Sequence, residues 1–272
     1  MSFWNIFLWI IVPYLALASL FIGLIWRWRT DKFGWVARSS ETYERTWLRI
    51  SSPLFHYGIL LVVLGHIGGL LIPESWTAAL GISEGMYHFM AVSLGSIAAL
   101  MTIVGLVGLL VRRFVVKSVR LATSASDIIM YIMLITAIAL GTLATVSTQL
   151  FGSDHGYNYR ETISPWFRSL FYFHPETGLM VDVPWEFKVH IIAGFLLFAA
   201  LPYTRLVHAV APPATYVARP YMVYRSRGTE VGDPGTWQGG EHTPSYQSTQ
   251  GTGKYGTTYT AGKKSSRDKE KV

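Results

Sequence analysis

Five long apolar stretches alternate with shorter polar connections along the chain. Each stretch is almost free of charged side chains and is long enough to cross a hydrocarbon core of about 30 Å, which takes around 20 helical residues. The predicted spans are residues 3–26, 53–73, 86–111, 128–150 and 187–211. The pattern predicts an all-α integral membrane protein with five transmembrane helices. Pro13 and Pro202 are expected to kink the first and the last of them.

Composition and charge support this interpretation and orient the chain. Hydrophobic residues make up 51% and charged residues only 14%, against about 25% charged in soluble domains. The connections 27–52 and 112–127 hold most of the loop Lys and Arg, whereas 74–85 holds none and 151–186 holds two. Basic loops remain in the cytoplasm, which predicts an outer N-terminus and a cytoplasmic C-terminus. Because the net charge of +7 reflects topology, no nucleic-acid partner is expected.

Two segments outside the predicted spans differ in composition. Residues 151–186 are rich in aromatic side chains and predict an ordered outer lid rather than a flexible linker. After residue 227 the chain is rich in Gly, Ser, Thr and Tyr and cannot bury a core. The predicted organisation is a membrane domain over residues 1–227 and a disordered cytoplasmic tail over residues 228–272.

Histidine supplies the candidate chemistry. There is no cysteine, which excludes iron–sulfur clusters bound by this chain, thiolate zinc sites and covalent c-type haem. The second predicted span contains His56 and His66, and the fifth contains His190 and His208. Because an intramembrane imidazole is costly without a partner, all four are functional candidates.

Depth in the bilayer predicts how these histidines pair. The second and fifth spans run in opposite directions, so His66 is level with His190 near the outside, and His56 is level with His208 near the inside. Two facing imidazoles are what a six-coordinate b-type haem requires. The helical rises do not match: His190 and His208 are 18 residues apart, about 27 Å, and His56 and His66 are 10 residues apart, about 15 Å. A helix tilt or a kink would have to absorb the difference. The alternative is a haem-free anchor whose histidines relay protons.

Small and basic residues near these spans have two interpretations each. Gly58, Gly65 and Gly194 would give a porphyrin room beside a helix, or would allow close packing between helices. Arg112 and Arg113, at the inner end of the third span, are candidates for binding haem propionates, or they are loop charges that set topology.

Three segments resemble the gamma subunit of membrane-bound respiratory nitrate reductases: SSPLFHYGILLVVLGHIGGLLIP, VRRFVVKSVRLATSASDIIM and FKVHIIAGFLLFAALPYTRLVHAV. The resemblance extends over roughly residues 1–227. It implies a cytochrome b subunit in the bacterial cytoplasmic membrane, with two haem b groups held by His56, His66, His190 and His208. It implies oxidation of menaquinol or ubiquinol near the outer haem. Electrons would then pass to an iron–sulfur beta subunit and a molybdenum-containing alpha subunit that reduces nitrate.

The resemblance does not decide which residues bind quinol, nor does it exclude a related class of complex. The resemblance implies a quinol-binding lysine at the start of the third span, as in one familiar relative, but an ungapped comparison places Met86 there, with His88 two residues later. The quinol-site candidates are therefore Gly65, His66, Met86 and His88. A dihaem anchor of a formate dehydrogenase or a hydrogenase would share many of these features.

Overall fold

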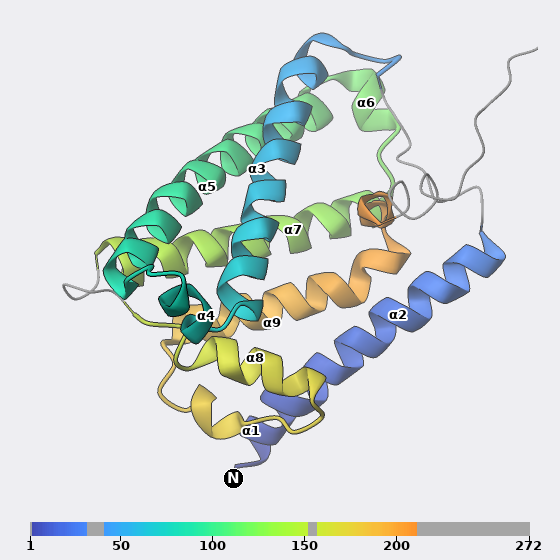
Figure 1. Cartoon of the computed structure of the whole chain (residues 1–272). Helices are drawn as coiled ribbons and strands as arrows, with labels where there is room; N and C mark the ends of the chain where they lie inside the picture. The colour runs from blue at the N-terminus through green and yellow to red at the C-terminus, as the bar shows by residue number, and fades with distance from the viewer. Residues whose placement is uncertain (1, 32–40, 152–156, 211–272) are drawn as a thin grey trace, which may run out of the picture. The chain divides into compact units, whose positions relative to one another are not determined.

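The computed structural model describes residues 2–31, 41–151 and 157–210 and folds them mainly into helices (Figure 1). The backbone divides into two units, Met1–Pro220 and Tyr221–Val272, and all described residues belong to the first. The predicted tail, 228–272, lies outside the described residues. The α-helices are α1 (Phe3–Ile6), α2 (Val12–Thr30), α3 (Thr46–Leu71), α4 (Glu74–Ala79), α5 (Glu84–Val115), α6 (Lys117–Leu121), α7 (Ala125–Ala144), α8 (Ile163–Phe171) and α9 (Trp185–Ala200).

Five helical stretches within the described residues are long and apolar enough to cross a membrane, which confirms the predicted number. They are Phe3–Thr30, Thr46–Leu71, Glu84–Val115, Ala125–Thr148 and Trp185–Tyr203. Several begin before the apolar run that predicted them, because polar residues cap their first turns. The Ser83 and Ser124 side chains accept hydrogen bonds from backbone N–H groups at the starts of α5 and α7.

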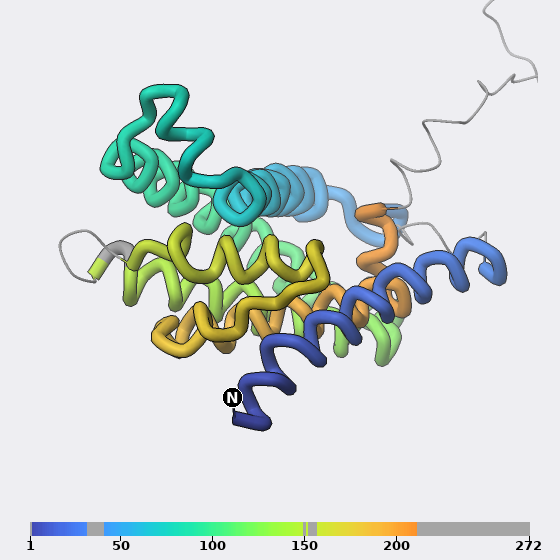
Figure 2. The backbone as a smooth tube through the Cα atoms, turned by 60° about the horizontal axis from the view of Figure 1, so that its bottom comes forward, coloured from blue at the N-terminus to red at the C-terminus, as the bar shows by residue number. Residues whose placement is uncertain are grey.

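The membrane-length helices pack in pairs, α3 along α5 and α7 along α9, while α2 packs against α9 (Figures 1 and 2). Glycines allow the closest approach between α3 and α5. A Cβ on Gly58 would lie 2.6 Å from the backbone nitrogen of Thr102. Gly58 therefore serves close helix packing, which is the second of the two interpretations offered by the sequence.

The two basic connections lie at the same end of these helices. Arg112, at the end of α5, forms an ion pair with Glu44, in the connection before α3, with Nε and Oε2 2.6 Å apart. Their contact agrees with the premise that both connections face one side of the membrane. Which side that is stays a prediction.

Pro13 changes the first helix in a way that holds it to the connection between α7 and α9. The turn before it, Phe7–Ile11, is a π-helix, because proline has no N–H to donate to the carbonyl four residues earlier. That carbonyl belongs to Trp9, and it accepts a hydrogen bond from Trp166 Nε1 of α8 at 3.3 Å. The two indole rings also pack edge to face, with centroids 5.6 Å apart.

The connection before α9 is ordered from residue 157 onward, which confirms the predicted order for its described part. That this lid lies on the outer side stays a prediction. It contains α8 and the 3-10 helix Thr177–Met180, and its buried core includes Trp166, Leu170 and Met180. The lid is also fastened to the helix ends beneath it. Ser164 donates to the Gly69 carbonyl at 2.8 Å, and Arg168 donates to the Leu70 carbonyl at 3.0 Å.

The predicted fifth span, 187–211, is wrong at its C-terminal end. Helix α9 stops at Ala200 and is followed by two short 3-10 helices, η4 (Leu201–Tyr203) and η5 (Arg205–Ala209). Pro202 ends the α-helix, since it cannot donate to the preceding turn, and Thr204 is extended, with φ −118° and ψ 179°. His208 therefore does not lie on the axis of α9, and the predicted distance of about 27 Å from His190 does not apply.

Candidate functional site

His66 and His190 come together between α3 and α9. Their ring centroids are 5.9 Å apart, and the ring planes are inclined by 49°. The side chain of His190 is partly buried, whereas His66 is exposed along one face of α3. This is the pair predicted to lie near the outside, and it is called the outer pair below. Both that side of the membrane and ligation by these residues stay predictions.

His56 and His208 form a second pair between α3 and η5. Their ring centroids are 6.0 Å apart, and the ring planes are inclined by 60°. The break after Ala200 removes the mismatch in helical rise, because His208 reaches His56 from η5 and not from a continuation of α9. Each pair thus joins the second span to the fifth span or to the segment that follows it. The pair of His56 and His208 is called the inner pair below, after its predicted depth.

All four imidazoles are oriented by backbone carbonyl groups. A carbonyl oxygen can only accept, so each Nδ1 carries the proton and each Nε2 keeps its lone pair. This is the tautomer that a metal-binding histidine uses when its other ring nitrogen is held by a second partner. The Nδ1–O distances are 2.7 Å for His56 to Ser52, 2.8 Å for His66 to Val62, 3.1 Å for His190 to Ala137 and 2.5 Å for His208 to Arg205.

The spacing within each pair fits a metal ion bound by two axial imidazoles. Two metal–nitrogen bonds of about 2 Å on opposite sides of one ion place the ring centres roughly 6 Å apart. Within the described part of the chain, no group of three or more His, Cys, Asp or Glu side chains could hold a metal ion. Two imidazoles alone do not complete a coordination sphere, so the remaining ligands must come from a prosthetic group such as a porphyrin.

Space for a large planar group lies beside the histidines. A Cβ built on Gly65, Gly68 or Gly194 would meet no atom within 4 Å among the described residues, apart from its chain neighbours and the nearby backbone of its own helix. Gly65 precedes His66 directly, and Gly194 is one turn after His190. These glycines, unlike Gly58, do not serve close helix packing, and so the residues present fit a porphyrin beside the outer pair.

An apolar cluster accompanies the inner pair. Leu106, Met130 and Leu134 are buried together, and the partly buried side chains packed on them come from α3, α5, α7, α9 and η5. One of these is Phe55, whose ring packs edge to face against His56 with centroids 5.4 Å apart. An apolar environment of this kind excludes water from a bound haem and influences its reduction potential.

Helix α7 contributes to the outer pair in a way the sequence did not predict. The Ala137 carbonyl orients His190, and this is the only one of the four carbonyl partners on a different helix from its histidine. One turn later, a Cβ on Gly141 would lie 2.7 Å from His190 Cε1. The backbone of α7 therefore lies directly against the imidazole and leaves it little freedom to move.

The two propionate candidates have different surroundings. Arg112 is 3% exposed and donates to both the carboxylate and the carbonyl of Glu44, at 2.6 and 2.7 Å. Burial acts to raise the pKa of the Glu44 carboxyl, but hydrogen bonds from Trp47 N–H and Arg112 outweigh it, so this pKa is lowered. Arg113 has no carboxylate partner among the described residues and instead contacts Thr123 and Tyr131 at 3.3 and 3.4 Å.

The remaining quinol-site candidates begin α5. Met86 is exposed and His88 is partly buried, and among the described residues neither side chain has a hydrogen bond or ring contact with a paired histidine. Their neighbour Tyr87 is better connected, since its hydroxyl lies 3.4 Å from that of Tyr159 in the lid. The structure therefore does not join Met86 or His88 to His66 directly.

A buried arginine, which the sequence did not single out, ties the lid to α4 and α5. Arg160 is 4% exposed. Its guanidinium donates to Thr77 at 2.8 Å and to Glu84 at 3.3 Å, and it stacks 3.8 Å from the centre of the Tyr87 ring. Burial raises the pKa of the adjacent Tyr159, which keeps that phenol protonated. The Tyr159 hydroxyl abuts Gly69, one turn beyond His66.

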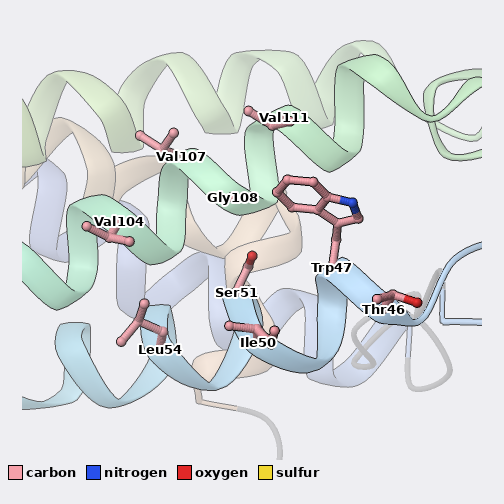
Figure 3. A pocket seen from close by; sticks show the side chains of 9 residues that line it. All are labelled: Thr46, Trp47, Ile50, Ser51, Leu54, Val104, Val107, Gly108 and Val111. Carbon is pink, nitrogen blue, oxygen red and sulfur yellow. The ribbon is translucent and has the colours of Figure 1, made fainter.

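A groove of about 450 Å³ between α3 and α5 is separate from the histidine pairs (Figure 3). Its walls include Ile50, Leu54, Val104 and Val107, with Trp47 at one side. No titratable side chain lines it. The groove therefore adds no chemistry to the site formed by the histidines.

Comparison with known proteins agrees with these features. Residues 5–227 match the family described as nitrate reductase gamma subunit. The nitrate reductase-like protein NarX of Mycobacterium tuberculosis is 48% identical over 220 residues, which are 80% of this chain but 33% of that protein, so the chain spans about a third of its length. The nitrate reductase gamma chain of Bacillus subtilis is 44% identical over 81% of this chain and 97% of its own length. The respiratory nitrate reductase 1 gamma chain of Escherichia coli is 32% identical over 84% and 100%.

Proposed function

The chain belongs to the nitrate reductase gamma subunit family, and we propose that it is the dihaem cytochrome b subunit that oxidises quinol for a respiratory nitrate reductase. Five membrane-length helices make it a multi-pass protein of the bacterial cytoplasmic membrane. Two pairs of facing imidazoles support this function most directly. The ring centroids are 5.9 and 6.0 Å apart, and a backbone carbonyl accepts from every Nδ1.

His66 and His190 would hold the outer haem, and His56 and His208 the inner one. When bound, each haem would supply reversible one-electron oxidation and reduction. The chain's own contribution is to fix the imidazole tautomers through backbone carbonyls, which leaves each Nε2 available for iron. It also places an apolar cluster next to the inner pair through Phe55 and leaves Gly65 and Gly194 without bulk beside the outer pair.

The proposed quinol site is at the outer end of α3 and α5, with Gly65, His66, Met86 and His88 as candidate residues. Quinol bound there would release its protons on the outer side and its electrons inward. Moving one charge fully across the membrane against 100 mV costs about 2.3 kcal/mol, and a partial crossing costs proportionally less. Part of the redox energy would thereby be stored as membrane potential.

The proposed orientation places the N-terminus outside and the tail in the cytoplasm, from the distribution of Lys and Arg. Residues 228–272 form the proposed disordered tail. Electrons would leave the inner end to an iron–sulfur beta subunit, which would supply a molybdenum-containing alpha subunit. In this arrangement the chain carries quinol oxidation and electron transfer, and nitrate is reduced on another subunit.

The test is to reduce the purified complex with a menaquinol analogue and with dithionite, and then to add nitrate. We expect b-type spectra under both reductants and reoxidation of the quinol-reduced haems by nitrate. An absent b-type spectrum in a well-assembled complex would indicate a haem-free anchor. Reduction by quinol without reoxidation by nitrate would indicate an anchor for a different oxidoreductase, of the formate dehydrogenase or hydrogenase class.

A further inference from the structure

His208 lies on a segment whose position cannot be maintained by helix α9. The α-helix ends at Ala200, and Thr204 adopts an extended conformation before η5 begins. A 3-10 helix as short as η5 has little stability of its own. The position of the His208 imidazole opposite His56 must therefore depend on side chains that fasten this segment to the rest of the protein.

The strongest of these fastenings is a two-point ion pair between Arg205 and Asp127. Arg205 Nε lies 2.7 Å from Asp127 Oδ1, and Nη2 lies 2.7 Å from Oδ2. The Asp127 side chain is 4% exposed and that of Arg205 is 17% exposed. Two parallel hydrogen bonds between charged groups fix direction as well as distance, which a single contact does not.

Both partners are themselves held in place. The Asp127 carboxylate accepts from the Ser124 backbone N–H at 3.0 Å, and Ser124 Oγ accepts from the Asp127 N–H at 3.3 Å, a capping box at the start of α7. The segment before Arg205 is held from α2, since Arg27 Nη1 donates to the Pro202 and Thr204 carbonyls at 2.6 and 3.0 Å.

Arg205 also holds the imidazole directly. Its backbone carbonyl is the acceptor for His208 Nδ1 at 2.5 Å. One residue thus fixes the tautomer and ring direction of His208 and, through its guanidinium, locks that carbonyl onto α7. A rotation of η5 would disturb both interactions together.

We propose that Arg205 and Asp127 are positioning residues for His208, which set its ring direction for the inner haem of the proposed function. Loss of this support should weaken inner-haem binding by roughly 10- to 100-fold, as for other second partners of metal-binding histidines. The hydrogen bonds and the ion pair of Arg205 and Asp127 described above do not include His66 or His190, so the outer haem should be retained.

The experiment compares R205Q, R205K and D127N with wild type in the full complex. The readouts are haem per chain, the reduction potential of each haem and the low-spin EPR signal of each haem. R45Q is the matched control, because Arg45 also pairs with a carboxylate, Glu41, but both side chains are largely exposed. Haem content of the wild type tests the proposed function, whereas the difference between variants and wild type tests this inference.

We expect R205Q and D127N to lose the inner-haem signal or to shift its g-values and potential, with the outer haem unchanged. R205K keeps the charge but not the fork geometry, so it should retain more inner haem than R205Q while its signal stays perturbed. Wild-type signals for both haems in R205Q and D127N would overturn the proposal. Equal loss of both haems in R205K would also overturn it, because the pair would then support the fold in general.

Discussion

Replacing Gly141 by alanine should displace one predicted haem ligand and leave the other three in place. The added Cβ would stand 2.7 Å from His190 Cε1, 3.1 Å from Nδ1 and 3.2 Å from Nε2. Ordinary contact begins near 3.4 Å, so the ring would have to retreat by about 0.7 Å. The new methyl group cannot move away from the ring, because Gly141 lies on the same helix as the Ala137 carbonyl that orients His190.

A displacement of this size is large on the scale of metal coordination. Metal–ligand distances in proteins are held within about 0.2 Å, so a shift of about 0.7 Å should break or severely weaken the bond from His190. The same movement disturbs the hydrogen bond to Ala137, and loss of such a second partner alone costs roughly 10- to 100-fold in affinity. We therefore expect Gly141→Ala to lose most of the outer haem and quinol oxidation, while the inner haem is retained.

The assay is haem per chain together with the low-spin EPR signal of each haem, measured on the purified complex. The matched control is Gly95→Ala on α5, where a Cβ would meet no atom of another described helix within 4 Å and both haems should persist. Two unperturbed haems in Gly141→Ala would refute the reasoning, since His190 would then tolerate a contact that the structure makes too close.

Three further predictions concern the quinol site, the inner end and the tail. His88→Leu should slow haem reduction by a menaquinol analogue while dithionite still reduces both haems; a wild-type rate would remove His88 from the site. Arg113→Gln should lower the potential of the inner haem by on the order of 59 mV, a tenfold change for one electron, whereas Arg112→Gln should lower it less because Glu44 already balances that charge. Equal reduction potentials of the inner haem in the two variants, measured by redox titration, would contradict this. Truncation after Gly228 should keep both haems and quinol-dependent nitrate reduction; lost activity with normal haem content would mark the tail as a docking element.

The number of spans was predictable because lipid imposes a simple rule on sequence. A helix that crosses the hydrocarbon core must be apolar for about 20 residues, and the five apolar runs correspond to the five helices. The polar first turns were less predictable, since the Ser83 and Ser124 caps extend α5 and α7 beyond the apolar runs.

The candidate ligands were predictable from residue type and depth, but their supports were not. His56 and His66 bond to carbonyls four residues earlier, which a helix provides automatically. The Ala137 carbonyl reaches His190 across 53 positions in sequence. Such a contact depends on how two helices pack, and no local pattern of residues encodes it.

The proline residues show the same limit. Pro202 predicted a change in the fifth span, but the local sequence does not distinguish a kink from the end of the α-helix. The outcome depends on distant donors, because Arg27 satisfies the Pro202 and Thr204 carbonyls and so permits the chain to leave the helix. At Pro13 the freed Trp9 carbonyl finds Trp166, 157 positions away.

Haem content per chain, in the wild-type complex and in variants of each histidine pair, decides whether this protein holds two b-type haems. A pyridine haemochrome assay with protein quantitation should give about two b-type haems in the wild type. His66→Ala or His190→Ala should remove the outer haem, and His56→Ala or His208→Ala should remove the inner one. A wild-type value near zero in an assembled complex would contradict the account. So would loss of the same spectral component in the His66 and His56 variants with the other component retained.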